Sequence, residues 1–260
     1  MKKSTIIIAG LFWLACNNKK ETAVIFSDLR AENINGDVLS FVETPFKADS
    51  AGQTGELDSC CIFIAEYDEN GNTIKQINRN ETGKFEAVST RHENGLWESE
   101  KMTKNGKSYG YIETQIDDKG QYVGRKAFDT AGKLAFYYTG LTQNEYGQVL
   151  TWKRWDKDSV FRMEGESKYD KNLFIERTDK DSTGKIKLTS FAKYNDKGEQ
   201  IEITKTIVGK DSTVTKFTKY TYDAHDEMGN WTHRTTWNDK GMATKMVMRK
   251  FTYRNKEAKK

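Results

Sequence analysis

The strongest constraint on the fold is a tight-turn signal that recurs along most of the chain at nearly constant spacing. Between positions 71 and 147 the turn glycines lie 11 to 15 residues apart. Gly, Asn and Asp tolerate the positive φ angles that tight hairpin turns require. About eight residues remain between successive turns, which is the length of one β-strand. Clear copies of the turn are YDENGN (67–72), DDKGQ (117–121), NDKGEQ (195–200) and DEMGNW (226–231). The repeat predicts a succession of β-hairpins.

The segments between the turns alternate in polarity as strands do. Ile186, Leu188 and Ser190 share one side of a predicted strand, and Lys187 and Thr189 share the other. Short connections between consecutive strands force antiparallel pairing. Apolar residues make up 36% of the chain and aromatic residues 12%, which suits a sheet with one wet face. We therefore predict an all-β fold, an antiparallel β-meander of many hairpins that forms an elongated twisted sheet or curls into a partial barrel or roll.

The N-terminus, MKKSTIIIAGLFWLAC, has the features of a bacterial export signal. Two lysines precede an apolar run of about ten residues, which is too short to span a bilayer. Ala15-Cys16 resembles the lipobox of bacterial lipoproteins, in which the cysteine is lipidated and anchors the protein; a plain secretory signal is the alternative. We predict a signal peptide over 1–15, the lipidated Cys16 with a polar tether over 16–32, and one β domain over 33–260.

The turn copies carry a resemblance to a known family. EYDENGNTIKQ, KYNDKGEQIEI and TYDAHDEMGNWTHR resemble the YD repeats of Rhs-type bacterial proteins. With the lipobox, the strand-like NGDVLSFVETPFKA and the closing Gly-Asn-Trp-Thr, most of residues 33 to 254 resembles repeat lipoproteins of Bacteroidetes whose function is unknown. The resemblance implies a wound β-sheet in the cell envelope and supplies no catalytic residue. Asn17, rather than Asp, after the cysteine favours the outer membrane under the sorting rule of enteric bacteria.

Charge and motif content narrow the function classes. The net charge is +4, and lysines are mixed with acidic residues along the chain, whereas a nucleic-acid surface needs a concentrated basic stripe. No G-x-S-x-G motif and no metal-type cysteine spacing occurs. We predict a non-catalytic envelope protein without cofactor that acts as a binding or scaffold module for a protein or glycan. The alternatives are an immunity or accessory protein for a secreted toxin, and an envelope hydrolase.

Aromatic residues near the C-terminus are the candidate binding residues. Trp231, His233 and Trp237 occupy alternate positions of one predicted strand, and Tyr220 and Tyr222 alternate on the strand before it. Flat aromatic faces beside polar groups stack on sugars or contact protein partners. The alternative is that most of these rings form the core of a leucine-poor sheet, in part as cross-strand pairs.

Acidic residues and histidines also cluster around the last strong turn. The group could form a weak zinc or calcium site, but its spacing fits neither an EF-hand loop nor a zinc motif. We favour a turn in which the aspartates accept backbone N–H groups, so no metal site is predicted. The cluster comprises Asp223, His225, Asp226, Glu227 and His233.

Five Asp-Ser or Asp-Thr pairs resemble the acceptor sequence of periplasmic O-glycosylation in Bacteroidetes. Ordinary turn chemistry is the alternative explanation, because Asp-Ser and Asp-Thr are common turn pairs. The candidate acceptor residues are Ser50, Thr130, Ser159, Ser182 and Ser212.

Overall fold

The computed structural model describes residues 26–49, 52, 54–58 and 61–254. Within these ranges no helix is both long and apolar enough to cross a membrane. One short helix, α1 (Asp28–Ala31), is followed by seventeen strands. The strands are β1 (Val38–Ala48), β2 (Thr54–Leu57), β3 (Phe63–Tyr67), β4 (Thr73–Asn80), β5 (Gly83–Arg91), β6 (Trp97–Lys104), β7 (Lys107–Ile116), β8 (Tyr122–Phe128), β9 (Leu134–Gln143), β10 (Val149–Asp156), β11 (Phe161–Asp170), β12 (Leu173–Asp181), β13 (Ile186–Tyr194), β14 (Gln200–Val208), β15 (Thr213–His225), β16 (Trp231–Trp237) and β17 (Ala243–Tyr253).

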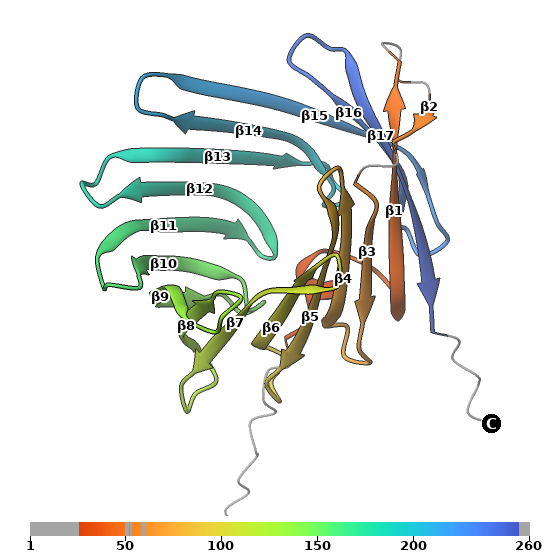
Figure 1. The fold of residues 1–260 in the computed structure, drawn as a ribbon. Helices are drawn as coiled ribbons and strands as arrows, with labels where there is room; N and C mark the ends of the chain where they lie inside the picture. Colours follow the sequence, from red (N-terminus) through yellow and green to blue (C-terminus); the bar gives the residue numbers. More distant parts are fainter. Residues whose placement is uncertain (1–25, 50–51, 53, 59–60, 255–260) are drawn as a thin grey trace, which may run out of the picture.

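The strands form a closed antiparallel barrel (Figure 1). Each strand from β3 to β17 pairs with the next, and β1 pairs with both β3 and β17. The ring therefore contains 16 strands, and the short β2 pairs with β1 as an extra strand. The predicted all-β antiparallel meander is confirmed, and its curled form is a complete barrel. Closure leaves no unpaired edge on the ring.

The turns explain why the repeat needs Asp or Asn three residues before Gly. In the first copy, the Asp68 Oδ1 atom accepts the N–H groups of Asn70 and Asn72 at 2.9 and 2.8 Å. The backbone adds a bond from Gly71 N–H to Asp68 C=O, and Gly71 has a φ of 79°. The same two side-chain bonds recur at Asp117, Asp129, Asn144, Asp156, Asp181, Asn195, Asp226 and Asn238.

The two faces of the barrel wall differ in chemistry. Phe41 of β1 packs in a buried cluster with Leu29 and Ile34, which belong to the segment before the barrel, so its face is the interior, or lumen, face. Directly paired residues share a face, and the strand registers carry this assignment around the ring. The outer face carries ion pairs such as Lys75 with Glu86, 3.3 Å apart.

The meander places every second turn at the same end of the barrel. The β3–β4, β5–β6, β7–β8, β9–β10, β11–β12, β13–β14 and β15–β16 turns lie at one end, and the remaining turns lie at the other. The segment around α1 forms its hydrogen bonds to turns at the end that holds the β3–β4 turn. We call the end that contacts α1 the plugged end, and the opposite end the open end.

Candidate functional site

Residues 26–37 cover one end of the barrel, and we call this segment the plug. Its apolar side chains Leu29 and Ile34 are 6% and 9% exposed and pack on Phe41, Ala65 and Tyr67 of the lumen wall. The structure thus differs from the predicted tether over 16–32, because its last part is packed against the barrel. The segment is too short for a visible helical period, and its order comes from tertiary contacts.

Hydrogen bonds attach the plug to turns around the rim. The plug backbone bonds Asn94, Gly71 and Asn230 of the β5–β6, β3–β4 and β15–β16 turns. Side chains make the remaining bonds: Gln148 donates to Ala31 C=O at 3.3 Å, and Asn172 donates to Arg30 C=O at 3.0 Å. The Asn33 side chain donates to Lys197 C=O at 3.1 Å. Since these turns belong to strands all around the ring, the plug spans the mouth.

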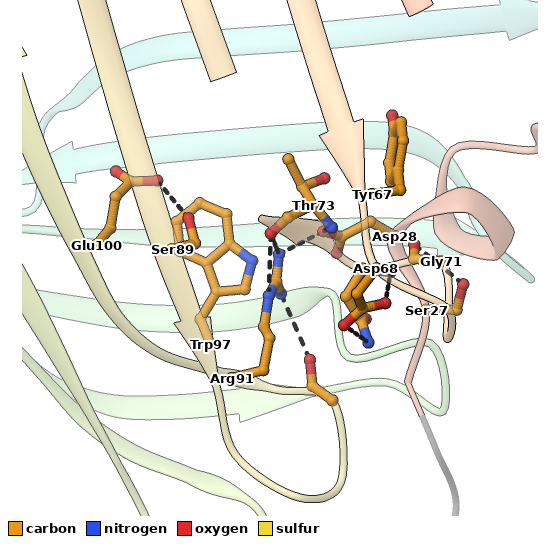
Figure 2. Close-up of polar contacts among 12 residues, drawn as sticks. Ser27, Asp28, Tyr67, Asp68, Gly71, Thr73, Ser89, Arg91, Trp97 and Glu100 are labelled. Atoms are coloured by element: carbon orange, nitrogen blue, oxygen red, sulfur yellow. Dashed lines mark hydrogen bonds and ion pairs between the residues drawn. The ribbon is translucent and has the colours of Figure 1, made fainter. Parts of the chain in front are cut away.

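An ion pair joins the start of the plug to the wall (Figure 2). The Arg91 guanidinium lies 2.5 Å from the Asp28 carboxylate and also donates to the carbonyl oxygens of Thr73 and Gly95. The second Asp28 contact is the Thr73 N–H, at 2.8 Å. The Arg91 side chain is 8% exposed. This pair of a buried arginine and a partly exposed aspartate, 27% exposed, holds α1 at the β3–β6 side of the rim.

A cavity of about 340 Å³ lies beside the plug on the other side of the rim. Its wall includes the Trp231 ring, which the guanidiniums of Arg249 and Arg234 approach to 3.7 and 4.7 Å from its centre. Arg249 is paired with Glu43, and burial lowers the pKa of its guanidinium. Tyr222 completes this group, and burial raises its pKa to about 12. The cavity therefore presents two guanidiniums backed by aromatic rings, and the carboxyl groups of Glu32 and Glu199 also line it.

Glu32 of the plug projects into the same cavity. The pKa of its carboxyl is raised to about 7, mainly by desolvation and secondly by the Asp28 carboxylate, whereas Arg249 opposes the shift. The Tyr67 hydroxyl donates to this carboxyl at 3.4 Å. The side chain keeps access to water from the cavity. The plug thus carries a group that changes charge near neutral pH.

We expect Glu32 to make barrel stability depend on pH. Its pKa is raised from 4.5 to about 7, so its stabilising contribution is complete below pH 4.5 and is lost as the pH rises towards 7. Glu32→Gln should therefore become more stable than wild type across this window, by about 1 to 2 kcal/mol above pH 7. A fully buried carboxyl with this shift would give roughly 3 kcal/mol, but cavity water screens the charge.

Urea denaturation from pH 4.5 to 8 measures this difference between variant and wild type. The exposed turn residue Glu69 provides a control, because Glu69→Gln should leave the difference flat across the same range. A flat difference for Glu32→Gln as well would show that the carboxyl titrates in the folded protein as it does in the unfolded chain.

A second cavity, of about 250 Å³, lies under the β5–β6 side of the plug. Arg125 lines it between the rings of Trp97 and Tyr122, whose centres lie 5.6 and 5.9 Å from the guanidinium carbon. Arg91 stands over the same Trp97 ring at 5.0 Å. Arginine beside aromatic rings is thus common to both cavities.

The five predicted binding residues do not share one face. Tyr222 pairs with Arg234 on the lumen face, and Trp231 joins them at the cavity. Tyr220 lies under the same guanidinium at 5.1 Å. His233 neighbours Arg234 in the chain and faces outward.

Trp237 also faces outward, and its indole N–H donates to the Thr221 hydroxyl at 3.0 Å. Irregularities in the register between β15, β16 and β17 break the simple alternation from which a common face was predicted. The predicted set is therefore split between the lumen and the outer wall.

The geometry of the last strong turn explains the cluster of acidic residues and histidines around it. Asp226, and not Asp223, is the turn residue, because its Oδ1 atom accepts the N–H groups of Met228 and Asn230. His225 thus occupies the place of Tyr67 in the first copy, and its Nε2 atom lies 2.5 Å from Glu199. Among the described residues, no group of three or more potential ligands is placed to hold a metal ion.

The candidate glycosylation residues lie in turns at the open end. Thr130, Ser159, Ser182 and Ser212 are exposed in the β8–β9, β10–β11, β12–β13 and β14–β15 turns. Ser50 and Cys16, the predicted lipidation residue, lie outside the described residues. Glycosylation and lipidation stay predictions.

The arginines of the lumen wall are the candidate residues that the sequence analysis missed. Arg91, Arg125, Arg154, Arg177, Arg234 and Arg249 all lie on the lumen face, whereas most strand lysines lie outside or at strand ends. A signal was present, because the chain uses Arg and not Lys at these positions, and Arg stacks on rings better than Lys does. The net charge of the chain does not reveal that arginines lie on the lumen face and most lysines lie on the outer face.

Comparisons with known proteins support the fold. No protein-family model and no curated protein matches the sequence. A porin-like protein from Bacteroides uniformis ATCC 8492 aligns with a TM-score of 0.54 and 11% identity, over 84% of this chain and 99% of that chain. A porin-like protein from Bacteroides vulgatus ATCC 8482 gives a TM-score of 0.34 at 11% identity, over 84% and 98% of the two chains. The Photorhabdus luminescens Tc holotoxin pore gives 0.31 at 14% identity, over 79% of this chain and 13% of that chain. The first likeness shows a shared barrel fold.

Proposed function

We propose that this chain is a non-catalytic, lipid-anchored protein of the cell envelope whose barrel stands in water and binds a ligand in its lumen. The observation that carries the proposal is the sidedness of the wall. Lysine–glutamate pairs lie on the outer face, and six arginines packed over aromatic rings lie on the lumen face beside two cavities.

The outer face favours water over lipid. Lys168 with Glu176 and Lys193 with Glu202 are outward ion pairs within the strands, 2.9 and 2.8 Å apart. A membrane-spanning barrel has an outward apolar band, and a lysine at the bilayer midplane costs about 2 to 4 kcal/mol. The barrel is therefore better suited to attachment through Cys16 than to insertion through its strands.

The interior favours ligand binding over free passage. A barrel of 16 strands encloses enough space for water-filled passage. The plug spans one mouth and bonds to turns around the rim, which leaves the open end as the entrance. Polar groups that converge beside aromatic rings in a concave site are typical of ligand pockets.

The anchoring part is tested with the full chain after residues 1–16 are exchanged for a cleavable secretory signal. We expect the exchanged protein in the soluble fraction and wild type in the membrane fraction after a carbonate wash. An exchanged protein that stays in washed membranes would show that the strands themselves insert.

The binding part is tested by affinity capture from envelope extracts with the protein immobilised through its C-terminus, together with a glycan array. We expect a partner or glycan whose capture is lost when Trp231→Ala opens the cavity wall. Capture of nothing by the folded wild-type protein would contradict the proposed function.

A further inference from the structure

The lumen arginines lie over aromatic rings. Arg154 stands 4.3 Å from the centre of the Phe136 ring, and Arg177 stands 5.4 Å from that of Trp152. Arg234 lies between Trp231 and Tyr220, at 4.7 and 5.1 Å. Contact with a ring restricts the rotation of a guanidinium and so limits the directions in which its N–H groups can point.

Half of these arginines have a carboxylate partner in the wall or plug. Arg91 pairs with Asp28, Arg177 with Asp179 and Arg249 with Glu43. Each carboxylate accepts hydrogen bonds from guanidinium N–H groups that would otherwise need another acceptor. These three arginines therefore have partners within the protein and need no ligand.

The other half have no such partner. Among the described residues, Arg125, Arg154 and Arg234 take part in no ion pair, and the buried Nε atom of each has no hydrogen-bond acceptor. The Glu100 carboxylate interacts electrostatically with Arg125 without pairing with it, and the Tyr222 hydroxyl interacts with Arg234. A buried donor left unbonded costs about 1 to 3 kcal/mol, and more when it is charged. Buried polar groups that lower the stability of a fold are expected at functional sites.

Their arrangement covers two walls of the lumen. Tyr138 pairs with Arg125 on one side and with Arg154 on the other, so the two arginines flank it across β8, β9 and β10. Neighbouring strands lie about 4.8 Å apart, which puts these arginines roughly 10 Å from each other. Arg234 on β16 lies about half a turn around the ring.

We propose that the lumen binds anionic ligands, bearing carboxylate, sulfate or phosphate groups, at two separate places on its wall. One place is formed by the terminal guanidinium N–H groups of Arg125 and Arg154 on β8 and β10, and the other by those of Arg234 on β16 beside the cavity of about 340 Å³. The inference rests on the proposed function and names the ligand chemistry. The planar fork of arginine matches such oxyanions in bidentate geometry, and the bonds are charge-assisted. The aromatic rings orient the guanidiniums. This role differs from the one predicted from the sequence, in which the rings themselves stack on a ligand. Since guanidiniums cover these ring faces, a stacked nucleobase fits the site less well than an oxyanion does.

Calorimetric titration of the full chain in detergent tests the inference. The probes are trigalacturonate, its neutral methyl ester, inorganic sulfate, inorganic phosphate and adenosine monophosphate. We expect trigalacturonate or a free oxyanion to bind, and the ester to bind at least tenfold more weakly. The sulfate and phosphate arms separate recognition of a free ion from recognition of an acidic sugar.

Three substitutions identify the residues. Arg154→Gln and Arg234→Gln should each weaken anion binding about 10- to 100-fold, the range expected for loss of a charge-assisted bond. Arg234→Lys should recover only part of the loss, since it keeps the charge without the fork. Arg162→Gln is the control, because this exposed arginine pairs with Asp156 and should bind as wild type does.

The outcomes separate the inference from the proposed function. Equal binding of acid and ester, unchanged in the Gln variants, would overturn the anion inference and leave a lumen binding site in place. Tighter binding of adenosine monophosphate than of phosphate would show that the rings stack on a base. No binding by any probe would overturn the inference, whereas the proposed function fails only if envelope capture also returns nothing. Melting temperatures of the Gln variants at or above wild type exclude loss of fold as the cause.

Discussion

Arg91→Ala is expected to destabilise the protein by about 3 kcal/mol, the lower end of the range for removing one partner of a buried ion pair, because the Asp28 carboxylate left behind is 27% exposed. The side chain bonds the Asp28 carboxylate and the carbonyl oxygens of Thr73 and Gly95, so its removal takes one donor from each of three acceptors, of which Asp28 keeps the Thr73 N–H. Asp28 lies in α1, and we expect the start of the plug to detach. Urea denaturation and hydrogen exchange of the plug amides measure the two effects.

The matched control is the ion pair of Arg162 with Asp156. This pair also joins an arginine to an aspartate, but the Arg162 side chain is 57% exposed, against 8% for Arg91. An exposed pair contributes about 0 to 1 kcal/mol, so Arg162→Ala should have a small effect. Similar losses for both variants would mean that burial at the plug adds nothing to the Arg91 interaction.

The local part of the fold was predictable because its chemistry repeats within a few residues. Each turn fixes its own geometry through one Asp or Asn side chain and one glycine, so the turns and the antiparallel order of strands followed from the sequence. Closure did not, because it depends on β1 pairing with β17 from the far end of the chain. No local pattern distinguishes an open sheet from a ring whose ends meet.

The candidate site was predictable only in part. Trp231, Tyr220 and Tyr222 were predicted as binding residues and lie on the lumen side, but their grouping with His233 and Trp237 assumed an unbroken period of two. The register irregularities of β15 and β16 place His233 and Trp237 on the other face, and a shift of one residue exchanges the faces of a strand. The plug contributes Glu32 and Asp28 from a stretch with no periodic signal at all.

The repeat also hides a difference between its own copies, which glycine substitutions should expose. At the plugged end, a Cβ atom on Gly95 would meet the Phe26 carbonyl oxygen of the plug, and one on Gly71 would lie 2.7 Å from Ser27 Oγ. At the open end, a Cβ atom on Gly132 would have nothing within 4 Å. The φ angles of Gly95 and Gly132 are 85° and 75°, so the backbone strain of an added side chain is similar.

Gly132→Ala should therefore cost about 1 to 2 kcal/mol, the strain of a non-glycine residue in the left-handed region. Gly95→Ala should cost about 3 kcal/mol or more, because displacement of the plug backbone adds a packing penalty of about 1 to 3 kcal/mol. Parallel urea denaturation measures the loss of unfolding free energy in each variant. Because the backbone strain is similar in the two turns, the difference between the losses gives the contribution of the plug contact. Equal losses would indicate that the plug does not press on the turns. A larger loss at Gly95 would show that turns of the same backbone type differ in role, because those at the plugged end also support the plug.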